Sequence, residues 1–337
     1  MNNRAYIEFI FLIILGVITS LSLPPFNYFI INFATFSLFF LFLIKKTNHH
    51  NNKKLFFIYG WLFGFGYFLS NLYWISISLT HDQNFEFLIP FTIFLIPSFL
   101  ALFYGLITFI FIILKPRKNI NSFFAFSLIY ASLEFLRGSI FTGFPWNLIA
   151  YSFSENIEIL NIISVIGTYG FNLFCISLFI TPALFILRET KVDVGVCIFF
   201  ITSLIFFYFY GSLNKEKLNK ADVKNYEFKL RVISSNISLE RFYDNKDSVL
   251  IIEELIKISN PKSNENTIFI WPEGILPNIS QNDLIEYNWL FKKYFNENHL
   301  LIIGINSYEN IKNENYFYNT LSIYDHKLNL ITDYKKV

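Results

Sequence analysis

Apolar residues occupy the first two thirds of the chain in long stretches, and the pattern changes near residue 226. A membrane-spanning helix needs about 20 mostly apolar residues. Seven stretches approach that length: 5–22, 28–44, 55–79, 87–114, 121–137, 159–187 and 193–212. The pattern predicts seven membrane-spanning helices. Arg4 precedes the first stretch as in a signal peptide, but no small-residue cleavage site follows it, so an uncleaved helix is expected.

From residue 226 onward, short alternating or apolar runs and amphipathic segments follow one another. Alternation and short apolar runs predict strands, and a helical period predicts a helix. The expected strands are 226–234, 267–271, 299–305, 315–325 and 328–334, and the expected helices are 247–259 and 281–296. This order indicates an α/β or layered α+β domain.

The charged residues divide the chain in the same way. Residues 1–213 hold 11 of the 27 Lys and Arg and 8 of the 25 Asp and Glu, about 9% of that part, against about 27% in residues 214–337. Soluble domains contain about 25% charged residues. We therefore predict a membrane domain over 1–213 and a water-soluble domain over 214–337. The net charge of +2 gives no reason to expect a nucleic-acid partner.

Basic residues in the short connections predict the orientation, because Lys and Arg concentrate on the cytoplasmic side. Ten of them fall at the N-terminus and in alternate loops, whereas the other three loops hold Arg137 alone. The ten are Arg4, Lys45, Lys46, Lys53, Lys54, Lys115, Arg117, Lys118, Arg188 and Lys191. The N-terminus is predicted to be cytoplasmic. Seven spans then place residues 214–337 on the periplasmic side of a bacterial inner membrane.

Two cysteines, Cys175 and Cys197, both lie within apolar runs. This excludes a disulfide framework and a cysteine-based zinc cluster. The sequence also contains no glycine-rich phosphate loop, and the pair His49–His50 lies in a Lys- and Asn-rich loop that reads as solvated. We expect neither a cofactor nor a metal.

Glu134 and Arg137 stand near the end of the fifth apolar stretch, three residues apart on one helical face. A carboxylate at membrane depth is a functional candidate; the alternative is an ion pair that anchors the helix end. The following segment, 138–153, is apolar and aromatic but interrupted by Gly and Pro. We expect it to be re-entrant or interfacial, on the side of the soluble domain.

In the soluble part, Glu273 directly follows the predicted buried strand 267–271, and Lys336 follows the last predicted strand. Catalytic side chains of α/β folds occupy such strand ends. A Glu there can act as a general base and a Lys can stabilise an oxyanion. From position alone, a loop Glu and a C-terminal Lys without any chemistry remain the alternative.

Short motifs in a fixed order along the chain resemble those of the apolipoprotein N-acyltransferases, inner-membrane enzymes with a nitrilase-like (carbon–nitrogen hydrolase) domain. They are Leu23-Pro24-Pro25-Phe26, Gly64-Phe65-Gly66-Tyr67-Phe68, Tyr73-Trp74, Glu134-Phe135-Leu136-Arg137-Gly138, Gly143-Phe144-Pro145-Trp146, Gly167-Thr168-Tyr169-Gly170, Ser235-Asn236-Ile237, Trp271-Pro272-Glu273, Gly304, Tyr318-Asn319-Thr320 and Tyr334-Lys335-Lys336. Each motif is weak alone, and their order is specific.

The resemblance implies a polytopic membrane domain followed by the N-terminal part of an αββα sandwich with a Glu–Lys–Cys triad. Glu273 corresponds to the general base and Lys336 to the oxyanion-stabilising lysine, with Lys335 as its neighbour. It also implies the partners: a phospholipid that donates an acyl chain through a thioester, and a diacylglyceryl-apolipoprotein whose N-terminal cysteine accepts it. Residues expected at the substrate and lipid sites are Trp146, Asn319, Tyr243, Glu134 and Arg137.

The chain departs from the family pattern at three places. Ser238 replaces a Pro, and Tyr243 stands where the family has a Trp. The sequence also stops at Val337, before the segment that carries the family's nucleophilic cysteine. Since a cysteine in apolar surroundings forms little thiolate, neither Cys175 nor Cys197 is expected to substitute. We expect residues 1–337 alone to be inactive.

Two other classes of protein fit parts of the pattern. One is a membrane-tethered nitrilase-like amidase that acts on a small soluble amide, which turnover of a labelled phospholipid would distinguish from an acyltransferase. The other is a transporter or scaffold with a degenerate soluble domain. Transporters carry charges in the middle of their spans, and here Glu134 is the clear candidate, near the end of one.

Overall fold

The computed structural model describes residues 3–49, 52–81, 83–141, 143–220, 226–234, 248–276, 278–311 and 314–336. The chain divides into two compact units, Met1–Ala221 and Asp222–Val337, called here the membrane unit and the sheet unit. The boundary lies later than the predicted 213/214. The reason is that the last helix of the membrane unit, α9 (Lys191–Asn219), continues past its apolar run into a charged end.

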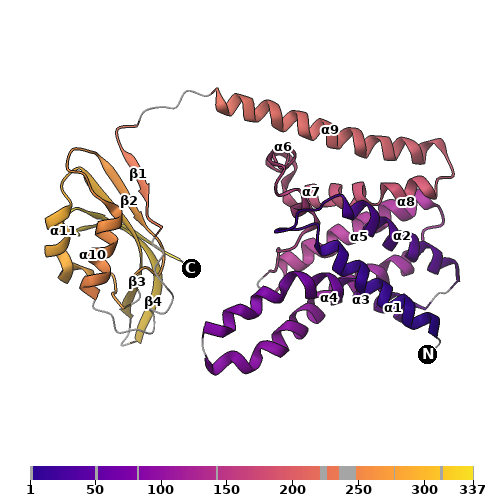
Figure 1. Cartoon of the computed structure of the whole chain (residues 1–337), viewed down its shortest axis with the longest axis horizontal. Coiled ribbons are helices and arrows are strands. Elements are labelled where there is room, and N and C mark those ends of the chain that lie inside the picture. Colours follow the sequence, from indigo (N-terminus) through magenta and orange to yellow (C-terminus); the bar gives the residue numbers. More distant parts are fainter. Residues whose placement is uncertain are drawn as a thin grey trace. The chain divides into compact units, whose positions relative to one another are not determined.

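The membrane unit is helical (Figure 1). Before α9 its elements are α1 (Asn3–Ser20), α2 (Ile31–His49), α3 (Lys53–Leu72), η1 (Tyr73–His81), η2 (Gln83–Leu88), α4 (Ile89–Leu114), α5 (Asn119–Ser139), η3 (Ile149–Phe153), α6 (Ile157–Leu160), α7 (Ile163–Phe179) and α8 (Thr181–Ile186). Helix therefore covers most of each of the seven predicted apolar stretches. Among the described residues, four stretches are long and apolar enough to cross a membrane: Lys53–Thr80, Asn84–Leu114, Ile163–Ile186 and Lys191–Asn219.

Helix α3 packs closely against both α1 and α4 because glycines lie at the contacts. A Cβ atom on Gly60 would stand 2.2 Å from the carbonyl oxygen of Tyr104, and one on Gly66 would stand 2.2 Å from that of Ile13. Small residues that let helix backbones approach in this way are typical of membrane helix packing. Aromatic rings fill the remaining space, as in the Phe39–Phe63 stack with centroids 4.1 Å apart.

The length of the sixth apolar stretch suggested a single helix, but the stretch contains several. It is divided among α6, α7 and α8, and Gly167 interrupts α7 with φ 72° and ψ 166°. Glycine reaches this conformation without the steric cost that a side chain would bring. Pro182, in the first turn of α8, lacks the N–H that a helix interior would require.

The sheet unit contains five strands in the order β1-β2-β3-β4-β5. They are β1 (Lys229–Val232), β2 (Thr267–Trp271), β3 (His299–Ile311), β4 (Glu314–Asp325) and β5 (Leu330–Lys335). The pairs β1–β2 and β2–β3 are parallel, and β3–β4 and β4–β5 are antiparallel. All five predicted strands are present. Helix α10 (Ser248–Ser259) matches its prediction, whereas 281–296 contains only the short η5 (Leu284–Tyr287) and α11 (Asn288–Tyr294).

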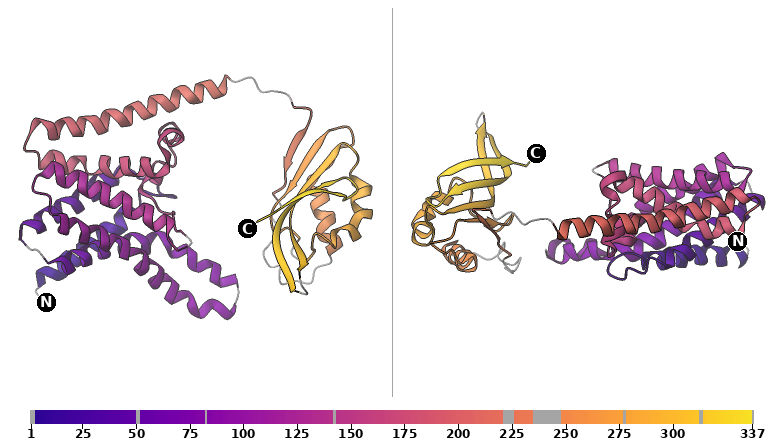
Figure 2. Two further views of the ribbon diagram at one scale, coloured as in Figure 1. Left: turned by 180° about the vertical axis from the view of Figure 1, so that it is seen from behind. Right: turned by 90° about the horizontal axis from the view of Figure 1, so that it is seen from above.

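The two faces of this sheet differ. Helices α10 and α11 cover one face (Figure 2). Phe269, Trp271 and Leu301 pack with buried residues of these helices. The opposite side chains of the strands point away from these helices, and among them Leu230 and Val232 of β1 are 68% and 71% exposed. We call this the open face. The described part of the unit is thus a mixed sheet with helices on one side.

Candidate functional site

The carboxyl end of β2 brings together three of the residues singled out from the sequence. Glu273 follows β2 after Pro272, Asn319 lies on β4, and Lys336 directly follows β5. The Asn319 side-chain amide donates a hydrogen bond to Oε1 of Glu273, and Nζ of Lys336 lies 3.8 Å from the same oxygen. Residues far apart in sequence thus converge on one carboxylate.

Strand alternation separates the two adjacent lysines. The Lys336 N–H donates to the Asn319 carbonyl over 2.9 Å, which continues the β4–β5 ladder beyond Lys335. Because successive side chains of a strand point to opposite faces, Lys336 shares the open face with Asn319. Lys335 points the other way, where it pairs with Glu309 and lies 5.1 Å from the centroid of the Tyr318 ring.

The cluster is open to solvent. The side chains of Lys336 and Glu273 are 69% and 61% exposed. An ion pair this exposed adds little to folding stability. The arrangement therefore leaves the carboxylate and the ammonium group accessible to a reacting molecule. A carboxylate beside an amide donor and a cation can remove a proton and stabilise a developing negative charge.

Gly304 of β3 makes room for Glu273. A Cβ atom at this position would stand 2.7 Å from Cα of Glu273 and 2.9 Å from its backbone nitrogen. Since both neighbouring atoms are backbone, they cannot rotate away as a side chain would. The position of the candidate base therefore requires a residue without a side chain at position 304 of the adjacent strand.

We predict that Gly304→Ala displaces Glu273 and destabilises the sheet unit by about 1–3 kcal/mol, the usual cost of overpacking. Local hydrogen exchange of the β2 and β3 amides in the intact chain would measure the change. The control is Gly195→Ala in α9, where a Cβ atom meets nothing within 4 Å. Unchanged exchange in Gly304→Ala would contradict the close contact.

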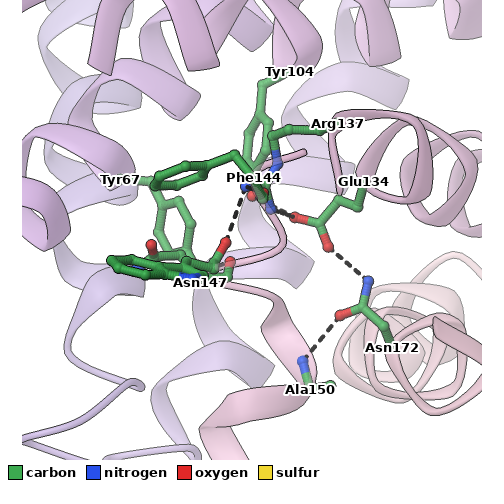
Figure 3. A network of polar contacts seen from close by, with 9 residues as sticks. Tyr67, Tyr104, Glu134, Arg137, Phe144, Asn147, Ala150 and Asn172 are labelled. Carbon is green, nitrogen blue, oxygen red and sulfur yellow. Dashed lines mark hydrogen bonds and ion pairs between the residues drawn. The ribbon is translucent and has the colours of Figure 1, made fainter. Parts of the chain in front are cut away.

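In the membrane unit, Glu134 lies at the centre of a second polar cluster (Figure 3). Its Oε1 accepts from the Tyr104 hydroxyl at 2.9 Å and from Nη2 of Arg137 at 3.4 Å, and its Oε2 accepts from the Asn172 side chain at 2.6 Å. We call Tyr104, Glu134, Arg137 and Asn172 the Glu134 network. The Glu134 and Arg137 side chains are 1% and 0% exposed. The predicted pairing is confirmed, but deep inside the unit rather than at its surface.

The Glu134 network holds the irregular segment 144–150 by its main chain (Figure 3). Nη1 of Arg137 donates to the carbonyl oxygens of Phe144 at 2.7 Å and Trp146 at 2.9 Å, and the Asn172 side chain accepts from the Ala150 N–H at 3.0 Å. The Tyr67 hydroxyl adds a bond to the Asn147 carbonyl at 2.9 Å. Non-helical backbone at membrane depth needs such partners.

Trp146 projects from this segment and is 50% exposed. Its ring stacks on that of Trp74 from η1, with centroids 5.2 Å apart and planes 16° apart. The backbone of the segment is thus fixed inside the unit, while the aromatic side chain of Trp146 remains half exposed. The substrate-binding roles of Trp146, Glu134 and Arg137 stay predictions.

Several features of these sites were not evident in the sequence analysis. Asn172 is a polar residue inside an apolar run, and this signal could have identified it as a partner of Glu134. The contribution of Tyr104 and the stacking of Trp74 depend on helix packing, which one sequence does not reveal. Tyr243, predicted at the substrate site, lies outside the described residues. Cys175 and Cys197 are both buried in the membrane unit.

Comparison with known proteins shows which family the chain resembles. Residues 15–180 match the family model described as the apolipoprotein N-acyltransferase N-terminal domain. The chain is 28% identical over 278 residues to the apolipoprotein N-acyltransferase of Brucella melitensis, covering 79% of this chain and 52% of the relative. It is 31% identical over 277 residues to that of Rhizobium rhizogenes, covering 79% and 51%.

A match to the Rickettsia typhi protein of the same name has 35% identity over 158 residues, covering 47% of this chain and 30% of the relative. The matched part, 79% of the chain, is longer than the membrane unit, so the similarity extends into the sheet unit. The chain spans about half the length of the curated relatives that it matches over this range. The chain is thus similar to apolipoprotein N-acyltransferases over 79% of its length, and residues 15–180 match the N-terminal domain of that family.

Proposed function

We propose that this protein takes part in the transfer of an acyl chain from a phospholipid to the α-amino group of a diacylglyceryl-cysteine at the N-terminus of a lipoprotein. The observation that carries the proposal is the meeting of Glu273, Asn319 and Lys336 on the open face of the sheet. The similarity to apolipoprotein N-acyltransferases supports the choice of reaction.

The mechanism assigns a separate task to each residue. Glu273 takes the proton of a cysteine thiol, the thiolate attacks an ester carbonyl of the phospholipid, and Lys336 stabilises the oxyanion. The carbon–oxygen ester bond breaks, a lysophospholipid leaves and a thioester remains. The lipoprotein amine then attacks the thioester, an amide forms and the thiol is regenerated. Asn319 positions Glu273 through its hydrogen bond.

The thiol of this scheme is expected from the family's segment beyond Lys336. Within residues 1–337, Cys175 and Cys197 are buried among the helices of the membrane unit. A buried thiol in apolar surroundings is a poor nucleophile. The scheme therefore uses neither of them.

The open face supports the proposal of an αββα sandwich. Apolar residues of four strands lie on it, among them Val232, Ile270, Ile302 and Ile323. A sheet with one apolar face on helices and a second apolar face is suited to pack against another sheet. Glu273 and Lys336 would then lie between or beside the two sheets.

The proposed location is the inner membrane, with seven spans, a cytoplasmic N-terminus and a periplasmic sheet unit. The distribution of Lys and Arg supports this orientation, because ten lie at the N-terminus and in alternate loops, whereas the other three loops hold one. Alkaline phosphatase, which is active in the periplasm, should be active when fused after residue 220 and inactive when fused after residue 50. The reverse pattern would exclude this orientation.

The function is tested with a chimera that joins residues 1–336 to the C-terminal segment of an active relative. Loss of an oxyanion-stabilising group typically costs about 10²–10³ in rate, so Lys336→Met should reduce acylation by about that factor. Lys335→Met is the matched control, because that side chain points to the other face and pairs with Glu309. Equal effects of the two changes would contradict the assignment. The measurement is transfer of a labelled acyl chain from phospholipid to a diacylglyceryl peptide.

A further inference from the structure

Lys336, the residue proposed to stabilise the oxyanion, directly follows a strand that has little packing of its own. Among the described strands, β5 pairs with β4 alone, and all its residues are exposed except the half-buried Lys335. The β4–β5 ladder also has an irregularity between Ile323 and Tyr324. A strand with few buried contacts opens easily. The register of Lys336 on β4 therefore needs support from residues outside β5.

Gln281 contacts three consecutive strands of the sheet. Its backbone N–H donates to the carbonyl of Asn306 in β3 at 2.7 Å. Nε2 of its side chain donates to Oγ of Ser322 in β4 at 2.9 Å and to Oδ2 of Asp333 in β5 at 3.1 Å. One residue thus links β3, β4 and β5. We call Gln281, Ser322 and Asp333 the Gln281 brace.

The Gln281 brace lies close to the candidate site but on the other face of the sheet. Ser322 and Asp333 are register partners, and three residues further along the two strands the Lys336 N–H donates to the Asn319 carbonyl at 2.9 Å. Three residues of a strand span about 10 Å, and an odd number of steps changes the face. The brace can therefore hold β5 without obstructing the open face, where Lys336 lies beside Glu273.

Two features make the Gln281 brace a strong contact for β5. Ser322 is fully buried and Gln281 is half-buried, so water cannot replace the bond between them unless the sheet opens. The bond to Asp333 has an ionised acceptor, which strengthens a hydrogen bond. The ion pair of Lys335 with Glu309 also reaches β5, but its side chains are 31% and 45% exposed and such pairs contribute little.

We propose that Gln281 is a positioning residue for acyl transfer: it holds β5 on β4 in the register that places Lys336 beside Glu273. The inference rests on the proposed function for the role of Lys336. Gln281 does not touch the reacting atoms and acts through Lys336. Its loss should therefore reduce the rate only as far as Lys336 contributes to it.

The first test measures acyl transfer by the chimera of residues 1–336 with the C-terminal segment of an active relative. Gln281→Met keeps the length of the side chain and the backbone N–H but removes both side-chain hydrogen bonds. It should lower kcat by about tenfold and leave the KM for phospholipid within about twofold, because the affected interaction belongs to the transition state. Asp333→Ala should reproduce the loss, and Asp333→Asn, which retains an acceptor oxygen, should restore most of the rate.

A double-mutant cycle separates positioning from a general loss of structure. In a chimera that already carries Lys336→Met, Gln281→Met should cause little further loss, because the ammonium group that it positions is absent. The matched control is Asn298→Leu, which removes a side-chain amide bond of 2.8 Å to the Ser263 carbonyl before the amino end of β3. Its effect should stay within about twofold. A normal rate in Gln281→Met, or losses that multiply in the double variant, would overturn the inference.

Hydrogen exchange in the full chain distinguishes failure of this inference from failure of the proposed function. Gln281→Met should accelerate exchange of the β5 amides by about tenfold and leave the β2 amides unchanged. Faster exchange together with near-normal transfer in Lys336→Met would reject the proposed function and the positioning role with it. Unchanged exchange together with a severe loss in Lys336→Met would reject the role of Gln281 alone.

Discussion

Replacing Glu273 by Gln is expected to lower acyl transfer by about 10²–10⁴, the usual contribution of a positioned general base. Gln has nearly the same shape and retains an oxygen that accepts the hydrogen bond from Asn319. The change therefore removes the basic group while leaving the local contacts in place. Formation of the thioester should be the step that fails, because the thiol keeps its proton.

Single-turnover measurement of acyl-enzyme formation in the chimera would check this result. Glu309→Gln is the control: Glu309 is also a carboxylate of the sheet unit paired with a lysine, but its partner is Lys335. Its effect should stay within a few-fold. Near-normal thioester formation in Glu273→Gln would remove Glu273 from the mechanism and return it to an ordinary exposed loop residue.

Replacing Arg137 by Met is expected to destabilise the membrane unit by about 3–5 kcal/mol, the usual cost of leaving a buried charge without its partner. The change leaves Glu134 without its cation and deprives the Phe144 and Trp146 carbonyls of their donor. Unfolding of the chain in detergent by a denaturant series would measure it. The double change Glu134→Gln with Arg137→Met should be milder than the single one, because no unpaired charge remains.

Arg188 offers a matched control for this experiment. Its guanidinium also donates to a carbonyl, that of Phe185 at 2.7 Å, and lies 4.2 Å from the centroid of the Phe185 ring, but the residue is exposed. Arg188→Met should therefore change stability little. Equal stability of the Arg137→Met and Arg188→Met variants would show that the buried Glu134–Arg137 pair does not contribute more to stability than an exposed arginine.

The elements that sequence patterns predicted well are those whose residues decide their structure locally. The apolar run Thr267–Trp271 is β2 with the predicted bounds, and the spacing of Glu134 and Arg137 gives the observed pair. The segment 281–296 was predicted less well. There the Gln281 N–H donates to the Asn306 carbonyl at 2.7 Å and ties the segment to β3, so helix begins only at Leu284.

The hydrophobic periodicity of the sequence could not predict which residues meet at the candidate site. Glu273, Asn319 and Lys336 meet because β2, β3, β4 and β5 are neighbours in the sheet, and strand order is a long-range property. The family resemblance supplied the three residues in advance, while their roles remain predictions. The need for glycine at position 304 is likewise visible only once β3 lies against the backbone of Glu273.

The segment 144–150 is held through backbone atoms at Phe144, Trp146, Asn147 and Ala150, and the groups that hold it belong to other elements. Backbone groups are the same in every amino acid other than proline. Substitutions at Trp146 or Ala150 that keep the backbone conformation therefore keep these bonds. An engineer could vary the aromatic surface of this segment without rebuilding the scaffold beneath it.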